Sequence, residues 1–490
     1  MSKQHLHPIT IVVKLFQMMK QALAIFGFIV VLNITKLTWN PTDPRFKWTL
    51  LILLIIFVLV VLTIVYIVFW WRKFTYWIEN DELHVDEGIW IKKHQYVPFE
   101  RIQSINFKEG IFHRPFQLVK VSIETAGSED SGIDLLAISR AQAEWLDAAT
   151  KRAKRAKKEG VAVGEIEQEE IVTRETVYNM TTKNLLILAT TSSGIGVIFA
   201  AISSVLSQMP DIIPYERIFH ELQDFAKASI VLVSVLVFFV LLVSWLISVA
   251  WTYMNHANFT VEREDDRLFI SKGILEKKRV AVPLARIQGI KIVETPFRQL
   301  FGFAAVQLES AGNTDDDKTS TISLVPLIKK QEALTLLEAL FPAYTFEQSL
   351  THAPKQAAWR YMLFASFLAI IPVGCLCYFV PHGYGYFSLI LLALLALLGL
   401  MQYRSTGFAV SGRQLTLVTR GISKQTFYVM KNRIQTLMVA QSIFAENGQL
   451  ARLSVSIVAG KLESKTTLRF FEKKTLLHIF KWFQPHEKRG

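Results

Sequence analysis

The motif Arg-Ile-Gln occurs three times in this 490-residue chain, beginning at Arg101, Arg286 and Arg433. Each copy follows a glycine in a predicted turn and precedes an apolar, strand-like segment that ends in Ala-Gly. The turn glycines are Gly88, Gly273 and Gly421, and the segments end at Gly127, Gly312 and Gly460. The recurrence of one pattern at these intervals indicates a single structural unit that the chain uses three times.

Six apolar segments are long enough to cross a membrane, and they come in pairs ahead of each strand-rich region. They comprise residues 16–34, 49–71, 185–206, 229–251, 361–380 and 386–401. About 20 helical residues, at roughly 1.5 Å each, span a hydrocarbon core of about 30 Å. The second segment carries no charge and ends in Trp70 and Trp71 beside Arg72, as is typical of a membrane interface. We therefore expect three transmembrane helical hairpins.

Each pair of apolar segments is followed by short alternating runs that predict strands, and then by one helical pattern. The predicted fold class is an integral membrane protein, α-helical plus α+β, with three repeats of a transmembrane helical hairpin and a small strand-rich domain capped by a C-terminal helix. The predicted boundaries are 1–71 for the N-terminal tail and hairpin 1, 72–158 for domain 1, 159–183 for a charged linker, 184–252 for hairpin 2, 253–345 for domain 2, 346–359 for a linker, 360–401 for hairpin 3 and 402–490 for domain 3.

The formal net charge is +13, which in a soluble protein can indicate nucleic-acid binding. In a membrane protein, however, Lys and Arg accumulate on the cytoplasmic side, so we predict cytoplasmic domains and termini and no nucleic-acid partner. One basic run can contact anionic lipid headgroups, or it can be the solvated end of a helix that leads into the charged linker; its acidic neighbours favour the second interpretation. The run contains Lys151, Arg152, Lys154, Arg155, Lys157 and Lys158.

Searches for catalytic and metal-binding motifs return nothing specific. The chain lacks a phosphate-binding loop with Gly-Lys-Ser/Thr, a Gly-x-Ser-x-Gly elbow and a His-Glu-x-x-His motif. Its two cysteines, Cys375 and Cys377, lie in an apolar segment and are interpreted as small hydrophobic residues. We therefore predict no catalytic residue, no cofactor and no metal, and we expect the protein not to be an enzyme.

The segments Val97–Gln103 and Val282–Gln288 read Val-Pro-x-x-Arg-Ile-Gln, and they resemble the bacterial pleckstrin-homology (PH) domain membrane proteins of the YdbS/YdbT type, in particular the longer YdbT-like members. The third copy has Met430 in place of the proline. The resemblance implies that each domain is a seven-stranded, partly open PH-like barrel capped by a C-terminal helix. It also implies a bacterial inner-membrane location, a smaller YdbS-like PH-domain partner, and a role in protection against membrane-active peptide bacteriocins or envelope stress.

The motif residues have two interpretations. The three arginines can bind phosphate or carboxylate groups in a bidentate manner, or they can satisfy loop carbonyls and pair with acids of their own domain, such as Glu124 and Glu309. We favour the structural role, which the following glutamines share. These are Gln103, Gln288 and Gln435. The turn glycines are expected to adopt a positive φ, which only glycine tolerates without strain.

The predicted function is that of a non-enzymatic, membrane-anchored binding scaffold, acting in a homo- or hetero-oligomeric complex that helps the cell withstand antimicrobial peptides. The alternative is a transporter or lipid-handling channel with a path between the hairpins. Transporters usually carry ionisable residues at mid-membrane, and the six segments carry almost none. The most polar cluster, residues 190–193, lies beside Gly194 and Gly196 and is more simply a helix-packing surface.

Overall fold

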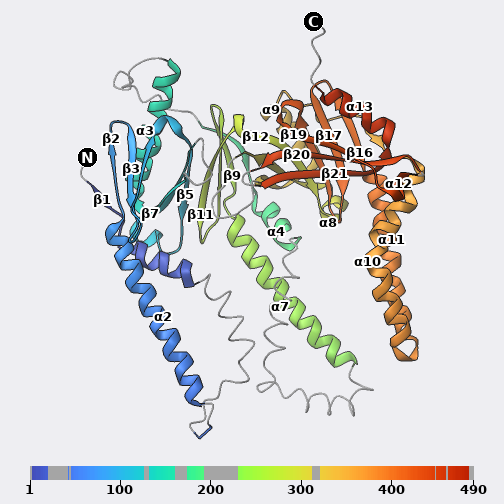
Figure 1. The fold of residues 1–490 in the computed structure, drawn as a ribbon, viewed down its shortest axis with the longest axis horizontal. Coiled ribbons are helices and arrows are strands. Elements are labelled where there is room, and N and C mark those ends of the chain that lie inside the picture. Colours follow the sequence, from blue (N-terminus) through green and yellow to red (C-terminus); the bar gives the residue numbers. More distant parts are fainter. Residues whose placement is uncertain are drawn as a thin grey trace. The chain divides into compact units, whose positions relative to one another are not determined.

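The computed structural model describes residues 3–19, 42–43, 46–125, 132–159, 174–191, 230–311, 321–446, 448–459 and 462–484 (Figure 1). They belong to two compact units, one comprising Met1–Glu264 with Leu268–Val282, the other Asp265–Arg267 with Pro283–Gly490. The division between the units falls inside the second repeat. The predicted domain boundaries are not tested by this division and stay a prediction.

The described residues repeat one order of elements three times: seven strands, then a helix. The first repeat has β1 (Gln4–His5), β2 (Thr75–Glu79), β3 (Glu82–Glu87), β4 (Lys93–Pro98), β5 (Ile102–Glu109), β6 (Leu118–Thr125), β7 (Ile133–Ser139) and α3 (Arg140–Glu159). The second has β8 (Glu175–Asn179), β9 (Thr260–Glu264), β10 (Arg267–Lys272), β11 (Lys277–Pro283), β12 (Ile287–Glu294), β13 (Phe303–Ser310), β14 (Thr321–Lys329) and α9 (Lys330–Leu340). The third has β15 (Thr351–His352), β16 (Gly407–Ser411), β17 (Gln414–Arg420), β18 (Lys424–Met430), β19 (Ile434–Ala440), β20 (Leu450–Ala459), β21 (Leu462–Glu472) and α13 (Lys473–Phe483).

The first strand of each repeat comes from the segment before the membrane helices, which the sequence analysis did not foresee. It pairs antiparallel with the strand that follows those helices, as in His5↔Thr75, Asn179↔Thr260 and His352↔Gly407. Two of these first strands are only two residues long. A strand this short has no alternation of polar and apolar residues, so its pairing cannot be recognised from the sequence.

Four helices among the described residues are long and apolar enough to cross a membrane. They are α2 (Phe46–Lys73), α7 (Ile230–His256), α10 (Ala358–Phe379) and α11 (Leu389–Ser405). Helix α2 has 28 residues, about 42 Å at 1.5 Å per residue, and only Thr49, Ile67 and Trp70 are buried. The predicted spans 16–34 and 185–206 lie largely outside the described residues. The structure describes only the parts that overlap a short helix, Ile9–Met19, and α4 (Thr182–Thr190).

Helices α10 and α11 pack against each other along their lengths (Figure 1). Gly399 of α11 makes the close approach possible, because an added Cβ would lie 2.6 Å from both the Cα of Met362 and the carbonyl oxygen of Tyr361. Small residues at helix contacts serve this purpose in membranes, where dispersion contacts rather than hydrophobic burial hold helices together.

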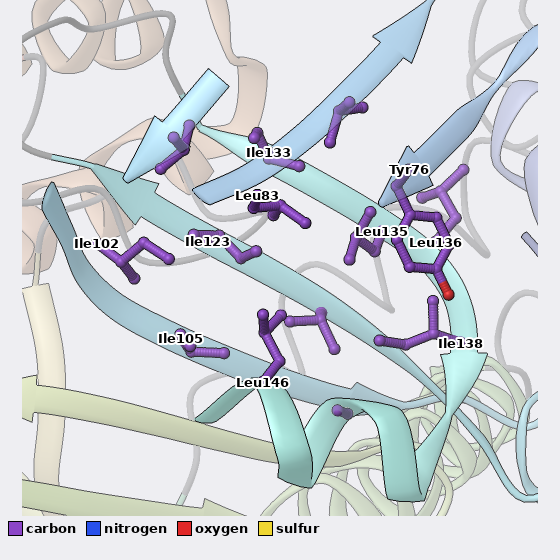
Figure 2. Packing of buried hydrophobic residues seen from close by; sticks show 14 of the residues in the cluster. Tyr76, Leu83, Ile102, Ile105, Ile123, Ile133, Leu135, Leu136, Ile138 and Leu146 are labelled. Carbon is purple, nitrogen blue, oxygen red and sulfur yellow. The ribbon is translucent and has the colours of Figure 1, made fainter. Parts of the chain in front are cut away.

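The first repeat has one hydrophobic core between two layers of strands. Leu83 enters it from β3, Ile105 from β5, Ile123 from β6 and Leu146 from α3, and all are at most 3% exposed (Figure 2). Each fully buried aliphatic side chain contributes about 1.5 to 3 kcal/mol. Helix α3 therefore closes the barrel-like core, as expected for a C-terminal capping helix.

The third repeat is built in the same way. Leu415 of β17, Phe427 of β18, Val455 of β20 and Leu468 of β21 meet Leu476 of α13 in a buried cluster. The apolar residues alternate along each strand, since successive side chains point to opposite faces of a sheet.

The seven-stranded sheets, however, are not contained in single repeats. The strand orders are β7-β6-β5-β11-β10-β9-β8 and β14-β13-β12-β18-β17-β16-β15, so that three strands of one repeat continue into four of the next. Each repeat therefore keeps the expected seven strands and C-terminal helix, while its fourth or fifth strand also pairs with a strand of a neighbouring repeat. The open edge of a fifth strand exposes unpaired backbone N–H and C=O groups, and the fourth strand of the following repeat satisfies them.

The turn glycines differ among the copies. Gly88 has φ +109° and Gly273 has φ +99°, and an added Cβ would lie 1.9 Å and 2.1 Å from the carbonyl oxygens of Ile91 and Glu276. Gly421 has no positive φ, and an added Cβ would meet nothing within 4 Å, so the expected positive φ is wrong there. The third copy has one residue fewer between this glycine and the motif arginine, which changes the turn.

We expect Gly88→Ala and Gly273→Ala each to lower the free energy of unfolding by about 1 to 3 kcal/mol, because a side chain there is strained and collides with a carbonyl. Gly421→Ala is the matched control and should stay within about 0.5 kcal/mol. Thermal unfolding of the detergent-solubilised chain measures both. Equal losses at all three positions would contradict this account of the turns.

Candidate functional site

The Arg-Ile-Gln motif forms the crossing between the two strand layers of a repeat. Its arginine ends a one-turn 3₁₀ helix, η2 (Phe99–Arg101), η5 (Leu284–Arg286) or η8 (Lys431–Arg433), and its isoleucine begins the fifth strand. The isoleucine N–H donates to the carbonyl of the first residue of that turn. Ile102, Ile287 and Ile434 are all buried. The motif therefore anchors the start of each fifth strand.

The three arginines have different surroundings. Arg101 is exposed, whereas Arg286 and Arg433 are half-buried. Arg433 donates from Nη2 to the carbonyl oxygen of Ala285 at 2.9 Å, so the motif of the third repeat binds the turn of the second. The buried Gln288 donates to the carbonyl of Arg286 at 3.1 Å, while Gln435 is exposed. These contacts to backbone carbonyls support the structural interpretation.

The two recurring glutamates contact the fifth strand of their own repeat. Glu309 accepts from Lys291 Nζ at 2.5 Å and from Thr321 Oγ1 at 3.1 Å. Glu124 accepts from Asn106 Nδ2 at 3.4 Å. Asn106 and Lys291 occupy the same position, four residues after the motif isoleucine. The glutamates thus fix the fifth strand to the sixth.

A buried carboxylate joins the first repeat to the second. Glu264, at the end of β9, is 5% exposed and accepts from Lys151 Nζ at 2.6 Å and Arg174 Nε at 2.9 Å. Lys151 also pairs with Asp147 of α3 at 3.2 Å. The capping helix of one repeat is therefore held to the first sheet of the next.

Lys151 thus uses its ammonium inside the protein, which for this residue favours the interpretation of the basic run as a helix end over lipid contact. Arg152 is exposed at the next position. The side chains of Lys154, Arg155, Lys157 and Lys158 lie outside the described residues, although their backbone is part of α3.

Three cations surround the buried ring of Phe269 on β10. Lys151 Nζ lies 5.4 Å from the ring centroid, and the guanidinium carbons of Arg174 and Arg279 lie 5.4 Å and 4.9 Å from it. Arg279 approaches Glu262 only to 3.7 Å, and its buried Nε and Nη2 have no hydrogen-bond partner among the described residues. Burial lowers the pKa of Arg279, and the neighbouring Arg174 cation lowers it further.

A groove of about 740 Å³ opens beside this network, between α3 and strands β5, β10 and β11. Its basic residues are Arg140, Lys151, Arg174, Lys272, Lys277, Lys278 and Arg279, and its acidic residues are Glu109, Glu144 and Asp147. The seven cations outnumber the three anions, so the groove favours an anionic group. The sequence analysis missed Glu264, Phe269 and Arg279, because their roles depend on a helix that belongs to another repeat.

No group of three or more His, Cys, Asp or Glu side chains suited to a metal is found among the residues that the structure describes. Cys375 and Cys377 are free thiols. The groove is the candidate site, and the charged groups that line it offer ion-pairing and hydrogen-bonding chemistry.

We expect Glu264→Gln to cost about 1 to 3 kcal/mol, because Lys151 and Arg174 lose a charged acceptor. Burial alone would raise the pKa of Glu264, but hydrogen bonds and charges from those two cations outweigh it and hold the pKa below its usual value. The carboxylate thus contributes stability at neutral pH, which is lost as the pH falls below about 4.3, the unfolded value, and through the folded pKa.

Thermal unfolding of the full chain in detergent, at neutral pH and near pH 4, tests this. The control is Glu276→Gln, which removes an exposed partner of Lys108 at 2.8 Å and should cost less than about 1 kcal/mol. Acidification should destabilise the native protein more than Glu264→Gln. An equal loss on acidification in both would show that Glu264 does not carry the effect.

Comparison with known proteins gives a consistent result. The family model described as "Bacterial PH domain" matches residues 25–153, 198–343 and 365–486, one match for each repeat. The "UPF0699 transmembrane protein YdbT" of Bacillus subtilis (strain 168) is 34% identical over 432 residues, covering 86% of this chain and 87% of that relative. No solved structure matches. The chain is therefore a membrane protein that belongs to the bacterial PH domain family, with three copies of the domain.

Proposed function

We propose that this protein is a non-enzymatic, membrane-anchored scaffold that helps a bacterial cell withstand membrane-active peptides or envelope stress. The carrying observation is that strands of successive repeats form common sheets, β5 with β11 and β12 with β18, so the repeats are built as a connected array. Such an array suits multivalent binding, in which linked sites raise the effective concentration of one another. The protective role rests on the family resemblance.

We place the repeats and both termini on the cytoplasmic side of the cell membrane. The supporting feature is the basic residues at helix ends next to the strand-rich regions: Arg72 and Lys73 end α2, and Arg404 lies in the last turn of α11. Arg360 lies near the start of α10. Lys and Arg beside membrane helices favour the cytoplasmic side.

The basic groove is the surface that we assign to an anionic partner. Lys277 at its rim is exposed, and Arg279 has buried N–H groups that an acceptor can satisfy. A smaller related PH-domain membrane protein is the partner that the family resemblance suggests.

The alternative of transport is less well supported. Three hydroxyl groups in the described helices donate to carbonyls of their own helix: Thr63 to Leu59 at 2.8 Å, Thr191 to Ile187 at 2.6 Å and Ser244 to Val240 at 2.7 Å. Such bonds are typical of helix packing in membranes, and they use hydroxyl groups that could otherwise contact a solute.

The test is peptide killing and dye leakage in a deletion strain across a panel of membrane-active peptides. The strain is complemented with the native gene, with Arg101→Ala, Arg286→Ala and Arg433→Ala combined, or with Lys277→Glu and Lys278→Glu combined. Membrane levels are checked by immunoblot. We expect the deletion to be sensitised and the groove variant not to rescue it, because its charge at the anionic site is reversed.

The matched control is Arg413→Ala, an exposed arginine in the turn between β16 and β17, which should rescue fully. Thr191→Ala with Ser192→Ala separates the two functions, since it should impair a transporter and spare a scaffold. A deletion strain that behaves like its parent against every peptide would end the protective proposal.

A further inference from the structure

The two inter-repeat junctions are copies of one interaction. In each, the fifth strand of one repeat pairs antiparallel with the fourth strand of the next, β5 with β11 and β12 with β18. The pairing includes Glu109↔Lys277 in the first junction and Glu294↔Lys424 in the second. Both glutamates lie seven residues after the motif isoleucine, and both lysines lie nine before the motif arginine. The register of strand pairing is therefore identical in the two junctions, although most of the other paired side chains differ.

One fourth strand and one fifth strand have no such partner strand among the described residues. Strand β4 is an edge of the sheet β1-β2-β3-β4, and β19 is an edge of the sheet β19-β20-β21, as far as the described residues show. β4 is a fourth strand and β19 is a fifth strand, and neither pairs with a strand of another repeat among the described residues. Each is half of the junction that the chain has already made twice.

The side chains at these edges are exposed where their internal counterparts are covered. Tyr96 of β4 is 57% exposed, whereas Tyr428, at the same position of β18, is 4% exposed. Met438 of β19 is 47% exposed, whereas Asn106, at the same position of β5, is 1% exposed. The covering strand β11 contributes to the burial of Asn106, whose Oδ1 accepts from the Ala281 N–H at 3.2 Å, while Tyr428 also packs against Phe346. For β4 and β19, no such covering strand lies among the described residues.

We propose that a second copy of this chain supplies the partner strand for each of these edges. In this arrangement β19 of one copy pairs with β4 of the next, head to tail, in the register of the internal junctions. That register places Leu437 opposite Tyr96, Met438 opposite Gln95 and Gln441 opposite Lys92. The interface joins two different surfaces, so it can repeat from copy to copy. A second copy is the occupant because this chain carries both halves.

The residues that would meet are compatible. At the first junction Lys108 forms an ion pair with Glu276 at 2.8 Å. The corresponding residues at the free edges are Ala440 and Ile91, so an apolar contact would take the place of this ion pair. Edge lysines often prevent strand pairing, but Lys92 just before β4 and Lys93 at its start correspond to Lys277 and Lys278 of β11, which pair with β5 nonetheless.

Disulfide trapping tests the proposal in native membranes. Two differently tagged full-length copies, both with Cys375→Ser and Cys377→Ser, carry Met438→Cys and Gln95→Cys respectively. Mild oxidation should give a product with both tags. The matched control replaces Met438→Cys by Val458→Cys, an exposed position on the neighbouring β20, and should give none.

Charge variants at the predicted Gln441–Lys92 pair give a second, graded readout. Both internal junctions have glutamate at the position of Gln441, so Gln441→Glu should raise the trapped fraction, and Gln441→Lys should lower it, by about two- to fivefold for a cross-strand charge pair. Adding Lys92→Glu to Gln441→Lys should restore it.

Several outcomes overturn the proposal: no product with both tags, equal trapping with Val458→Cys, or a bond formed only within one chain that carries both cysteines. Displacement of the second copy by a smaller PH-domain protein in the same membranes, seen as a trapped product of different mass, would also overturn it. Because trapping is read without any peptide challenge, its failure leaves the protective function standing, and the reverse holds as well.

Discussion

Backbone pairing between the fifth strand of one repeat and the fourth strand of the next is the interaction on which the architecture depends. A small barrel with seven strands and one helix leaves edges whose N–H and C=O groups need partners. At two junctions these groups are paired because the sheet of one repeat continues into the sheet of the following repeat. The two compact units follow from it, since each is centred on one shared seven-stranded sheet, and the second repeat is divided between them.

The side chains around each junction are fitted to this pairing. At the second, Gly289 lies opposite Val429, and an added Cβ would be 2.5 Å from the ring of Phe427, so a larger residue would displace that ring. The buried Glu294 beside it lies 3.1 Å from Lys330. At the first junction, Glu264 forms ion pairs with Lys151 and Arg174, and both cations lie over the ring of Phe269. Buried carboxylates need such partners, because an unpaired charge inside a protein is costly.

This use of charge shapes the functional account. Some cations that an unfolded chain would offer to lipid or nucleic acid are bound inside the protein, while others line the groove and the ends of α2 and α11. A PH-like fold by itself does not specify a ligand, since function depends on sites and not on folds. The groove beside α3 exists only because two repeats share a sheet. Its specificity would therefore belong to the array and not to one domain.

The sequence by itself determined the threefold repeat, the four described membrane helices and the glycine turns at Gly88 and Gly273. Each of these is encoded locally, by a run of apolar residues longer than the hydrocarbon core or by a backbone angle open only to glycine. Only the tertiary structure decided which edges pair, which residues form β1, β8 and β15, and that Lys151 pairs with Glu264. Alternation of polar and apolar residues shows which face of a strand is buried, but edge pairing is made by backbone groups common to nearly all residues, so the pattern of one strand does not identify its partner.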